Sequence, residues 1–373
     1  MVENTSLKAT PLINKHKSLG AKLAPFGGWL MPIQYSGIIE EHNWTRHSAG
    51  LFDICHMGEF EVEVSIDKSN LHNLVTVNLK DMPKGACRYG FMLNEDGGII
   101  DDLVVYRIAQ SKWMIVVNAA TTNSDEEHLR KHLDSGTRLK NISGLLGKLD
   151  LQGPESKKVI DELTGANVVL EYYNFGYYTL LGEKVIISRT GYTGELGYEL
   201  YMPNEKISQL WDKILMDKRV KPIGLGARDT LRLEMGYSLY GQDIDRKTSP
   251  LEAGLGSFIN WDKDFTGKSA LLKQKESGLG RRVICFIAGS RRSPRHNYRI
   301  SYKGKDIGAV TSGSFSPSLG VGIGMGYVED EISMGEEIIL TENAVSIPAK
   351  VVKKPFYKDG SVKYKEIKNA CAG

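Results

Sequence analysis

The sequence predicts an α+β fold followed by a β-rich C-terminal segment. Between residues 58 and 220, two strand-like runs followed by a helix-like run occur twice, and helical signals fade from about residue 281. Repeated strand–strand–helix units favour an α+β arrangement with a duplicated module over strict βαβ winding. Short β-like runs separated by turns favour a barrel or a sandwich for the C-terminal segment.

Strands open the first unit. Residues 58–65 alternate apolar side chains with glutamates, and this period of two predicts a strand with one wet face. Residues 102–108 and 113–119 are two apolar runs around the polar turn AQSK, so they predict a hairpin.

A helix follows the hairpin and is predicted from its end signals. Ser124 and Glu127 have the spacing of a capping box, and Gly136 marks a C-terminal stop. We therefore expect a helix within residues 121–136.

The second unit repeats this order. Residues 149–154 predict a strand and a turn, residues 155–165 a helix, and residues 184–202 two strands around a glycine-rich turn. A further helix is predicted at residues 204–217. Within residues 224–241, helix formers between two glycines predict another.

That last helix places two arginines, Arg228 and Arg232, one turn apart on one face. The β-like runs beyond it are residues 281–288, 298–313, 322–329, 336–342 and 347–356. We place the domain boundary in residues 273–280, a polar stretch that ends in glycines.

The chain thus divides into two parts. Residues 1–276 form two interleaved α+β subdomains with internal boundaries near residues 50 and 145, and residues 277–373 form the β-rich domain.

Composition excludes several classes of protein. The chain has 373 residues, 41% of them hydrophobic, and a formal charge of +3, which suggests no nucleic-acid partner. No apolar stretch approaches the roughly 20 residues that a membrane span requires. The N-terminal residues resemble no targeting signal, so we expect a cytoplasmic protein, or a mitochondrial matrix protein if a presequence was removed.

The cysteines predict neither disulfides nor a metal site. Cys55, Cys87, Cys285 and Cys371 are scattered without C-x-x-C spacing. His56 follows Cys55, but neighbours in an extended segment point to opposite faces and cannot easily converge on one ion. We therefore expect structural thiols, a structural histidine and no bound metal.

Familiar catalytic motifs are missing from the sequence. It contains no G-x-S-x-G, no G-K-[ST] phosphate loop and no H-E-x-x-H. The string GYTGELGYE lies between strand-like runs, but it lacks the helix that a dinucleotide site needs.

Two basic clusters stand out, at Arg281–Arg282 and at residues 291–299. They suit either a solvated loop or a surface for an acidic partner protein.

Two adjacent carboxylates, Asp101 and Asp102, stand in the string GGIIDDL at the edge of an apolar run. If they begin a strand, their side chains point to opposite faces, so only one enters a given pocket. The other would close a turn or pair with a base such as Arg107. A carboxylate in a partly dry cavity would stabilise a positive charge there.

Seven strings in one order carry a family resemblance. They are FGGWLMPIQYSGIIEEH, HSAGLFDICHMGEFEV, NEDGGIIDDLVVY, LQGPES, RTGYTGELGYE, GLGARDTLRLEMGYSLYGQDID and AVTSGSFSPSLGVGIGMGYV. Together they resemble the T-protein of the glycine cleavage system, a tetrahydrofolate-dependent aminomethyltransferase family, from about Thr10 to Phe356. The resemblance implies a duplicated folate-binding α+β region around a central cavity, followed by a β-barrel.

The resemblance also implies the reaction. The family transfers the methylene of an aminomethyl group on lipoylated H-protein to tetrahydrofolate, which gives 5,10-methylenetetrahydrofolate, ammonia and dihydrolipoyl H-protein. Two alternatives share the fold: a folate-dependent demethylase, such as dimethylsulfoniopropionate demethylase, and a non-catalytic folate-binding accessory protein. Accessory proteins of this fold carry a cysteine in a C-Y-x-G-Q motif, where this chain has GYTGELG without cysteine.

Site residues follow from the resemblance, position by position. Asp102 would be the catalytic carboxylate, and Asp101 would belong to the turn. The residues implied to contact folate are Met57, Tyr89, Val116, Asn118, Tyr192, Glu199, Arg228 and Tyr240. The implied partners are tetrahydrofolate and lipoylated H-protein, and the chain would be a monomer or a loose dimer.

Overall fold

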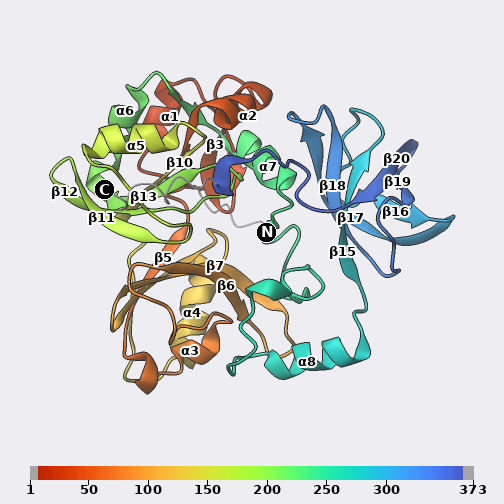
Figure 1. Ribbon diagram of the computed structural model, residues 1–373, viewed down its shortest axis with the longest axis horizontal. Coiled ribbons are helices and arrows are strands. Elements are labelled where there is room, and N and C mark those ends of the chain that lie inside the picture. The colour runs from red at the N-terminus through yellow and green to blue at the C-terminus, as the bar shows by residue number, and fades with distance from the viewer. Residues whose placement is uncertain (1–6, 364–373) are drawn as a thin grey trace, which may run out of the picture.

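The computed structural model describes residues 7–363, so Cys371 lies outside the described part. This part contains a six-stranded sheet, a five-stranded sheet and a closed barrel. Figure 1 shows the two sheets one above the other on the left and the barrel on the right. The mixed α+β class and the C-terminal barrel are therefore confirmed. Internal duplication and a central cavity stay predictions.

The five-stranded sheet is antiparallel throughout. Its strands in spatial order are β6 (Cys87–Leu93), β7 (Ile99–Ala109), β8 (Lys112–Val117), β5 (Gly58–Glu63) and β9 (Arg138–Asn141). Its short helices are η1 (Ile66–Lys68), α3 (Leu71–Leu74) and α4 (Thr122–His132). The predicted strand at residues 58–65 and the predicted hairpin are confirmed, and Phe60 and Trp113 lie fully buried in the core of this body.

The predicted capping box and stop of α4 are wrong. The helix begins at Thr122, so Ser124 lies in its first turn and its hydroxyl donates to the carbonyl oxygen of Thr121. The helix ends at His132 because Leu133 takes an extended conformation, with φ −71° and ψ 142°, before Gly136 is reached.

The six-stranded sheet holds the strands on either side of this body in the sequence. In spatial order they are β11 (Phe175–Leu180), β12 (Glu183–Ser188), β13 (Gly197–Pro203), β10 (Leu146–Gln152), β4 (Ala49–Asp53) and β14 (Val220–Ile223). Only β4 and β14 pair in parallel among these neighbours. The central strand β10 pairs with β13 in a register that sets Asp150 opposite Glu199.

Helices cover this sheet. They are α1 (Ile13–Ser18), α2 (Ile38–His47), α5 (Ser156–Thr164), η2 (Asn204–Lys206), α6 (Ile207–Leu215) and α7 (Leu225–Glu234). A small N-terminal sheet of β1 (Lys8–Ala9), β3 (Trp29–Gln34) and β2 (Lys22–Phe26) lies beside them. The predicted helices at residues 155–165, 204–217 and 224–241 are confirmed.

Gly224 caps the N-terminus of α7, where a β-carbon would lie 2.3 Å from the carbonyl oxygen of Ile33. Only glycine allows this close approach. Gly224 therefore allows the N-terminus of α7 to pack directly against β3.

The barrel is closed, which excludes a sandwich. Its strands in spatial order are β15 (Arg282–Ala288), β18 (Val321–Val328), β17 (Lys305–Ser316), β16 (Arg299–Tyr302), β19 (Glu337–Glu342) and β20 (Val345–Val352). Before it come η3 (Gly256–Phe258) and α8 (Lys268–Ser277), and η4 (Ser361–Lys363) follows it. The expected boundary at residues 273–280 is thus helical up to Ser277, and the division of the chain at residue 276 stays a prediction. None of the helices in residues 7–363 has the length and apolarity that crossing a bilayer requires.

A buried ion network fastens the barrel to α2 and α7. Glu234 at the end of α7 accepts hydrogen bonds from Arg46 at 2.8 Å and from the Ser318 hydroxyl at 2.8 Å. Burial alone would raise the pKa of Glu234, but hydrogen bonding and charge from His42, with the charge of Arg46, lower it to about 2. This network fixes the barrel against the helix that carries Arg228.

Candidate functional site

Asp102 lies inside β7 with its carboxylate held by two neutral donors. The Tyr89 hydroxyl donates to Oδ2 at 2.9 Å, and the Asn118 side-chain amide donates to Oδ1 at 2.7 Å. Tyr89 comes from the neighbouring strand β6, and Asn118 directly follows β8. Three adjacent segments of one sheet therefore converge on this carboxylate.

The surroundings of Asp102 favour its protonated form more than water does. Burial raises its pKa, the nearby Asp101 raises it further, and the hydrogen bonds from Tyr89 and Asn118 oppose the rise, which leaves a pKa of about 7. A carboxyl group with this pKa is half ionised near neutral pH, in the range suited to acid–base work.

The assignment of Asp101 to a turn is wrong. β7 begins at Ile99, so both aspartates lie within the strand, and Asp101 is fully buried. Its carboxylate accepts hydrogen bonds from the Asn118 backbone at 3.0 Å and side chain at 2.8 Å. Pairing with Arg107 is also excluded, because Arg107 donates to the Met82 carbonyl oxygen instead. Asn118 thus holds both carboxylates.

A second group forms on the six-stranded sheet around Glu199 and Arg228. Arg228 donates to Oδ2 of Asp150 at 2.9 Å. On the strand beside Asp150, Oε2 of Glu199 accepts the hydroxyls of Tyr201 at 2.9 Å and Tyr106 at 3.3 Å. Because Asp150 and Glu199 are cross-strand partners, this register brings the two predicted folate contacts into one cluster.

Tyr192 contacts the second group through Arg228. The guanidinium of Arg228 is 5.1 Å from its ring centroid, and the ring stacks on Tyr237 at 5.7 Å. Burial raises the pKa of Tyr192 well above its usual range, and the charges of both Asp102 and Arg228 act on its hydroxyl. Tyr192 is therefore in contact with Arg228 and within electrostatic range of Asp102.

The remaining predicted residues form walls and supports. Val116 is 2% exposed and packs in an apolar cluster that the half-buried Met57 borders. The Met57 sulfur lies 3.7 Å from Nζ of the buried Lys148. Tyr240 donates to the carbonyl oxygen of Ile99 at 3.3 Å, at the start of β7.

Sequence reasoning missed the polar face of β10. Lys148, Asp150 and Gln152 alternate with Leu149 and Leu151, and all five side chains are buried. The sequence shows this alternation with a period of two, which predicts a strand with one polar face exposed to water. In the structure that face is buried, and charged residues on a fully buried strand are unusual. That contradiction is the signal that could have identified a site.

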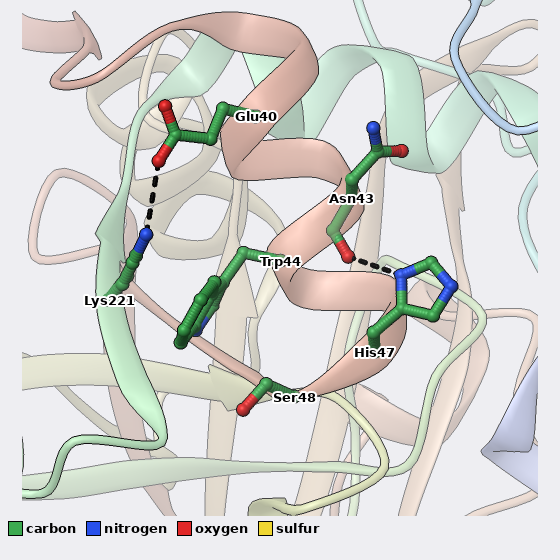
Figure 2. A pocket seen from close by; sticks show the side chains of 6 residues that line it. All are labelled: Glu40, Asn43, Trp44, His47, Ser48 and Lys221. Atoms are coloured by element: carbon green, nitrogen blue, oxygen red, sulfur yellow. Dashed lines mark hydrogen bonds and ion pairs between the residues drawn. The ribbon is translucent and has the colours of Figure 1, made fainter.

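A shallow recess lies elsewhere, on the outer face of α2 and β14, as Figure 2 shows. Its cavity volume is about 430 Å³, and its lining residues are Glu40, Asn43, Trp44, His47, Ser48 and Lys221. Lys221 pairs with Glu40 at 3.0 Å and covers the Trp44 ring at 3.9 Å. The Trp44 and Ser48 side chains donate to the backbone carbonyl oxygen of Arg219. None of the predicted site residues lines the recess.

The structure also places the Cys55–His56 pair. Both are buried; the Cys55 sulfur bonds to the backbone of Lys148, and His56 packs edge-on against Phe26 at 5.7 Å. Burial lowers the pKa of His56 to about 4, so it is neutral. Across residues 7–363, no three His, Cys, Asp or Glu side chains are grouped so as to hold a metal ion.

Comparison with known proteins covers almost the whole chain. The GCVT N-terminal domain family matches residues 12–263, and the glycine cleavage T-protein C-terminal barrel domain family matches residues 281–358. The chain is 49% identical over 356 residues to an aminomethyltransferase of Halothermothrix orenii, covering 94% of this chain and 100% of that protein. An aminomethyltransferase of Flavobacterium psychrophilum is 43% identical over 359 residues, with the same two coverages.

A solved structure agrees with these matches. The crystal structure of glycine cleavage system aminomethyltransferase T from Bartonella henselae superposes with a TM-score of 0.89 at 34% identity, over 95% of this chain and 99% of that chain. The sequence families, the relatives and the fold all agree, so this chain belongs to the glycine cleavage T-protein family, the aminomethyltransferases.

Proposed function

We propose that this enzyme takes the methylene of an aminomethyl group from the lipoyl arm of H-protein and gives it to tetrahydrofolate. In this reaction the methylene carbon loses its bond to the lipoyl sulfur and its bond to the amino nitrogen, and it forms two new bonds, to N5 and N10 of the folate. N5 and N10 each lose one proton. One of these two protons converts the sulfur to a thiol, and the other converts the amino group to ammonia. The methylene carbon has iminium-like, cationic character after an old bond has broken and before the new bond has formed.

The observation that carries this proposal is that the two side chains bound to the Asp102 carboxylate carry no charge. Its two hydrogen-bond donors, the Tyr89 phenol and the Asn118 amide, are both neutral. They orient the carboxylate and leave its negative charge available to a cationic carbon, whose formation it would stabilise. The pKa of about 7 also allows this group to accept a proton from a folate nitrogen.

The rest of the cluster suits a reduced pterin. Glu199 is oriented by two phenols, and a carboxylate is the natural acceptor for the donor-rich amino-pyrimidine edge of the ring. Tyr192, Met57 and Val116 supply aromatic and apolar surface, and Arg228 supplies a donor-rich cation. A few aimed polar groups on apolar walls are typical of a small-molecule site.

The basic segment before β16 suits the protein partner. Arg281 and Arg282 are each paired with a glutamate, at 3.2 and 3.1 Å, which removes them from the basic surface we expected. Arg291, Arg292 and Arg295 are exposed. We propose that these three steer an acidic H-protein toward the enzyme.

The test is a transfer assay with labelled carbon. Aminomethylated H-protein carrying a labelled methylene is mixed with the enzyme and tetrahydrofolate, and we expect one labelled 5,10-methylenetetrahydrofolate for each ammonia released. Omission of tetrahydrofolate is the control. Label transfer from a methylsulfonium compound but not from H-protein would instead establish a demethylase, and folate binding without either transfer would establish an accessory protein.

A further inference from the structure

Asp150 sits in the middle of the six-stranded sheet as a fully buried carboxylate. Each of its oxygens accepts one hydrogen bond. Oδ2 accepts from the charged guanidinium of Arg228 at 2.9 Å, and Oδ1 accepts from the neutral side-chain amide of Gln152 at 2.5 Å. Because both partners are donors, only a group with two acceptor oxygens satisfies both. A side-chain amide at this position would set one donor against another.

The Gln152 amide cannot turn to relieve such a conflict. Its oxygen accepts the Thr193 hydroxyl at 2.8 Å, and its nitrogen also donates to the Thr190 carbonyl oxygen at 3.0 Å. A β-carbon at Gly191 or at Gly197 would lie 2.1 Å from this amide, so the two glycines enclose it. Gln152 therefore fixes the orientation of the Asp150 carboxylate.

Two neighbouring carboxylates, Asp150 and Glu199, have different partners. Asp150 and Glu199 stand directly opposite on paired strands, where like charges repel. Asp150 accepts a hydrogen bond from the charged guanidinium of Arg228, whereas Glu199 accepts hydrogen bonds from two neutral phenols, those of Tyr201 and Tyr106. Burial raises the pKa of Asp150 to about 7, and the charge of Arg228 opposes this rise, so the ion pair favours the ionised carboxylate.

Asp150 also sets where Arg228 lies against the aromatic wall. The guanidinium lies 5.1 Å from the ring centroid of Tyr192 and 5.9 Å from that of Phe52, and the Arg228 side chain is 15% exposed. Without Asp150, Glu199 is the neighbouring carboxylate that could take this cation. A Glu199–Arg228 pair would occupy both groups that we assign to the pterin.

We propose that Asp150 is a positioning residue for folate recognition: it fixes Arg228 against Tyr192 and keeps it from neutralising Glu199. This inference rests on the proposed function. It adds a residue that determines affinity for the reduced pterin without contacting the reacting carbon.

The test separates binding from turnover in Asp150→Asn, which keeps the side-chain volume. We expect the dissociation constant of tetrahydrofolate, measured by titration calorimetry, to rise about tenfold, the effect of losing one hydrogen bond between charged groups. The turnover number at saturating folate should change much less. Asp150→Ala serves as a second variant, and thermal unfolding confirms that each variant is folded.

A double-mutant cycle with Arg228→Gln measures the coupling between Asp150 and Arg228 in folate affinity, and a purely structural role of Asp150 would produce no such coupling. If Asp150 acts through Arg228, the Asp150→Asn change should have little further effect on folate affinity once Arg228 is gone. Asp53→Asn is the matched control, because Asp53 is a buried carboxylate on the adjacent strand β4 whose side-chain partners, His16 and Thr10, lie outside the cluster.

The outcomes are distinct. Unchanged folate affinity in Asp150→Asn, or effects that simply add in the cycle, would overturn the positioning role. An equal loss of affinity in Asp53→Asn would overturn it too, since general destabilisation would then explain the result. A wild-type enzyme that binds no tetrahydrofolate would instead overturn the proposed function itself.

Discussion

Tyr89→Phe should shift the pH dependence of catalysis. The change removes one hydroxyl, which donates to Asp102 at 2.9 Å, and keeps the ring that packs edge-on against Phe91 and Phe258. This hydrogen bond favours the ionised carboxylate, so its loss raises the pKa of Asp102 above the present value of about 7. The reaction we propose needs the ionised form, and the acid limb must therefore move to higher pH.

The size of the shift follows from the bond that is lost. A hydrogen bond to a charged group contributes about 1.5–3 kcal/mol, and one pKa unit corresponds to about 1.4 kcal/mol, so we expect a shift of about 1–2 pH units. The assay is kcat/KM for the transfer between pH 5.5 and 9.5.

Activity of Tyr89→Phe should approach that of the wild type at the alkaline end. Tyr240→Phe is the control, because its hydroxyl bonds to a backbone carbonyl of β7 rather than to Asp102. An acid limb that stays in place in Tyr89→Phe, or one that moves equally in Tyr240→Phe, would refute the reasoning.

Three further predictions concern stability and association. Glu234→Gln should lower the free energy of unfolding by about 3 kcal/mol, since it leaves a buried arginine short of a carboxylate. The wild-type pKa of about 2 is depressed, so this stability is present above about pH 4.5 and is lost as pH falls toward 2; acid unfolding curves of equal slope in both proteins would contradict it. Gly197→Ala should cost about 1–3 kcal/mol in denaturant unfolding because its β-carbon meets Gln152, whereas Gly136→Ala, in open space, should not. Replacing the arginines of residues 291–295 by glutamate should slow H-protein association at low salt in stopped-flow mixing, and an unchanged salt dependence would exclude steering.

Local patterns in the sequence were sufficient for most of the fold. The alternation in residues 58–65 and the hairpin around AQSK each depend on neighbours along the chain, and both are present. The capping box at Ser124 failed because the helix start is decided by competition among Thr121, Thr122 and Ser124, all of which can bond to the local backbone.

The site was only partly predictable, because it depends on register between distant segments. The resemblance supplied Asp102, Glu199 and Arg228 as candidates. It could not show that Asp150 lies opposite Glu199 and binds Arg228, since this follows from the pairing of β10 with β13. Asp101 was misplaced for the same reason: the strand extends back to Ile99, which only the sheet reveals.

Comparison of Asp102→Asn with the wild type tests the central claim most directly. Asparagine keeps the shape of the side chain and removes the charge that we expect to stabilise the cationic carbon. We predict that kcat for methylene transfer falls by about two to four orders of magnitude, the range that charge stabilisation and acid–base groups typically supply, while the dissociation constant of tetrahydrofolate changes by only a few-fold. A kcat close to the wild-type value, with folate bound normally, would contradict the account.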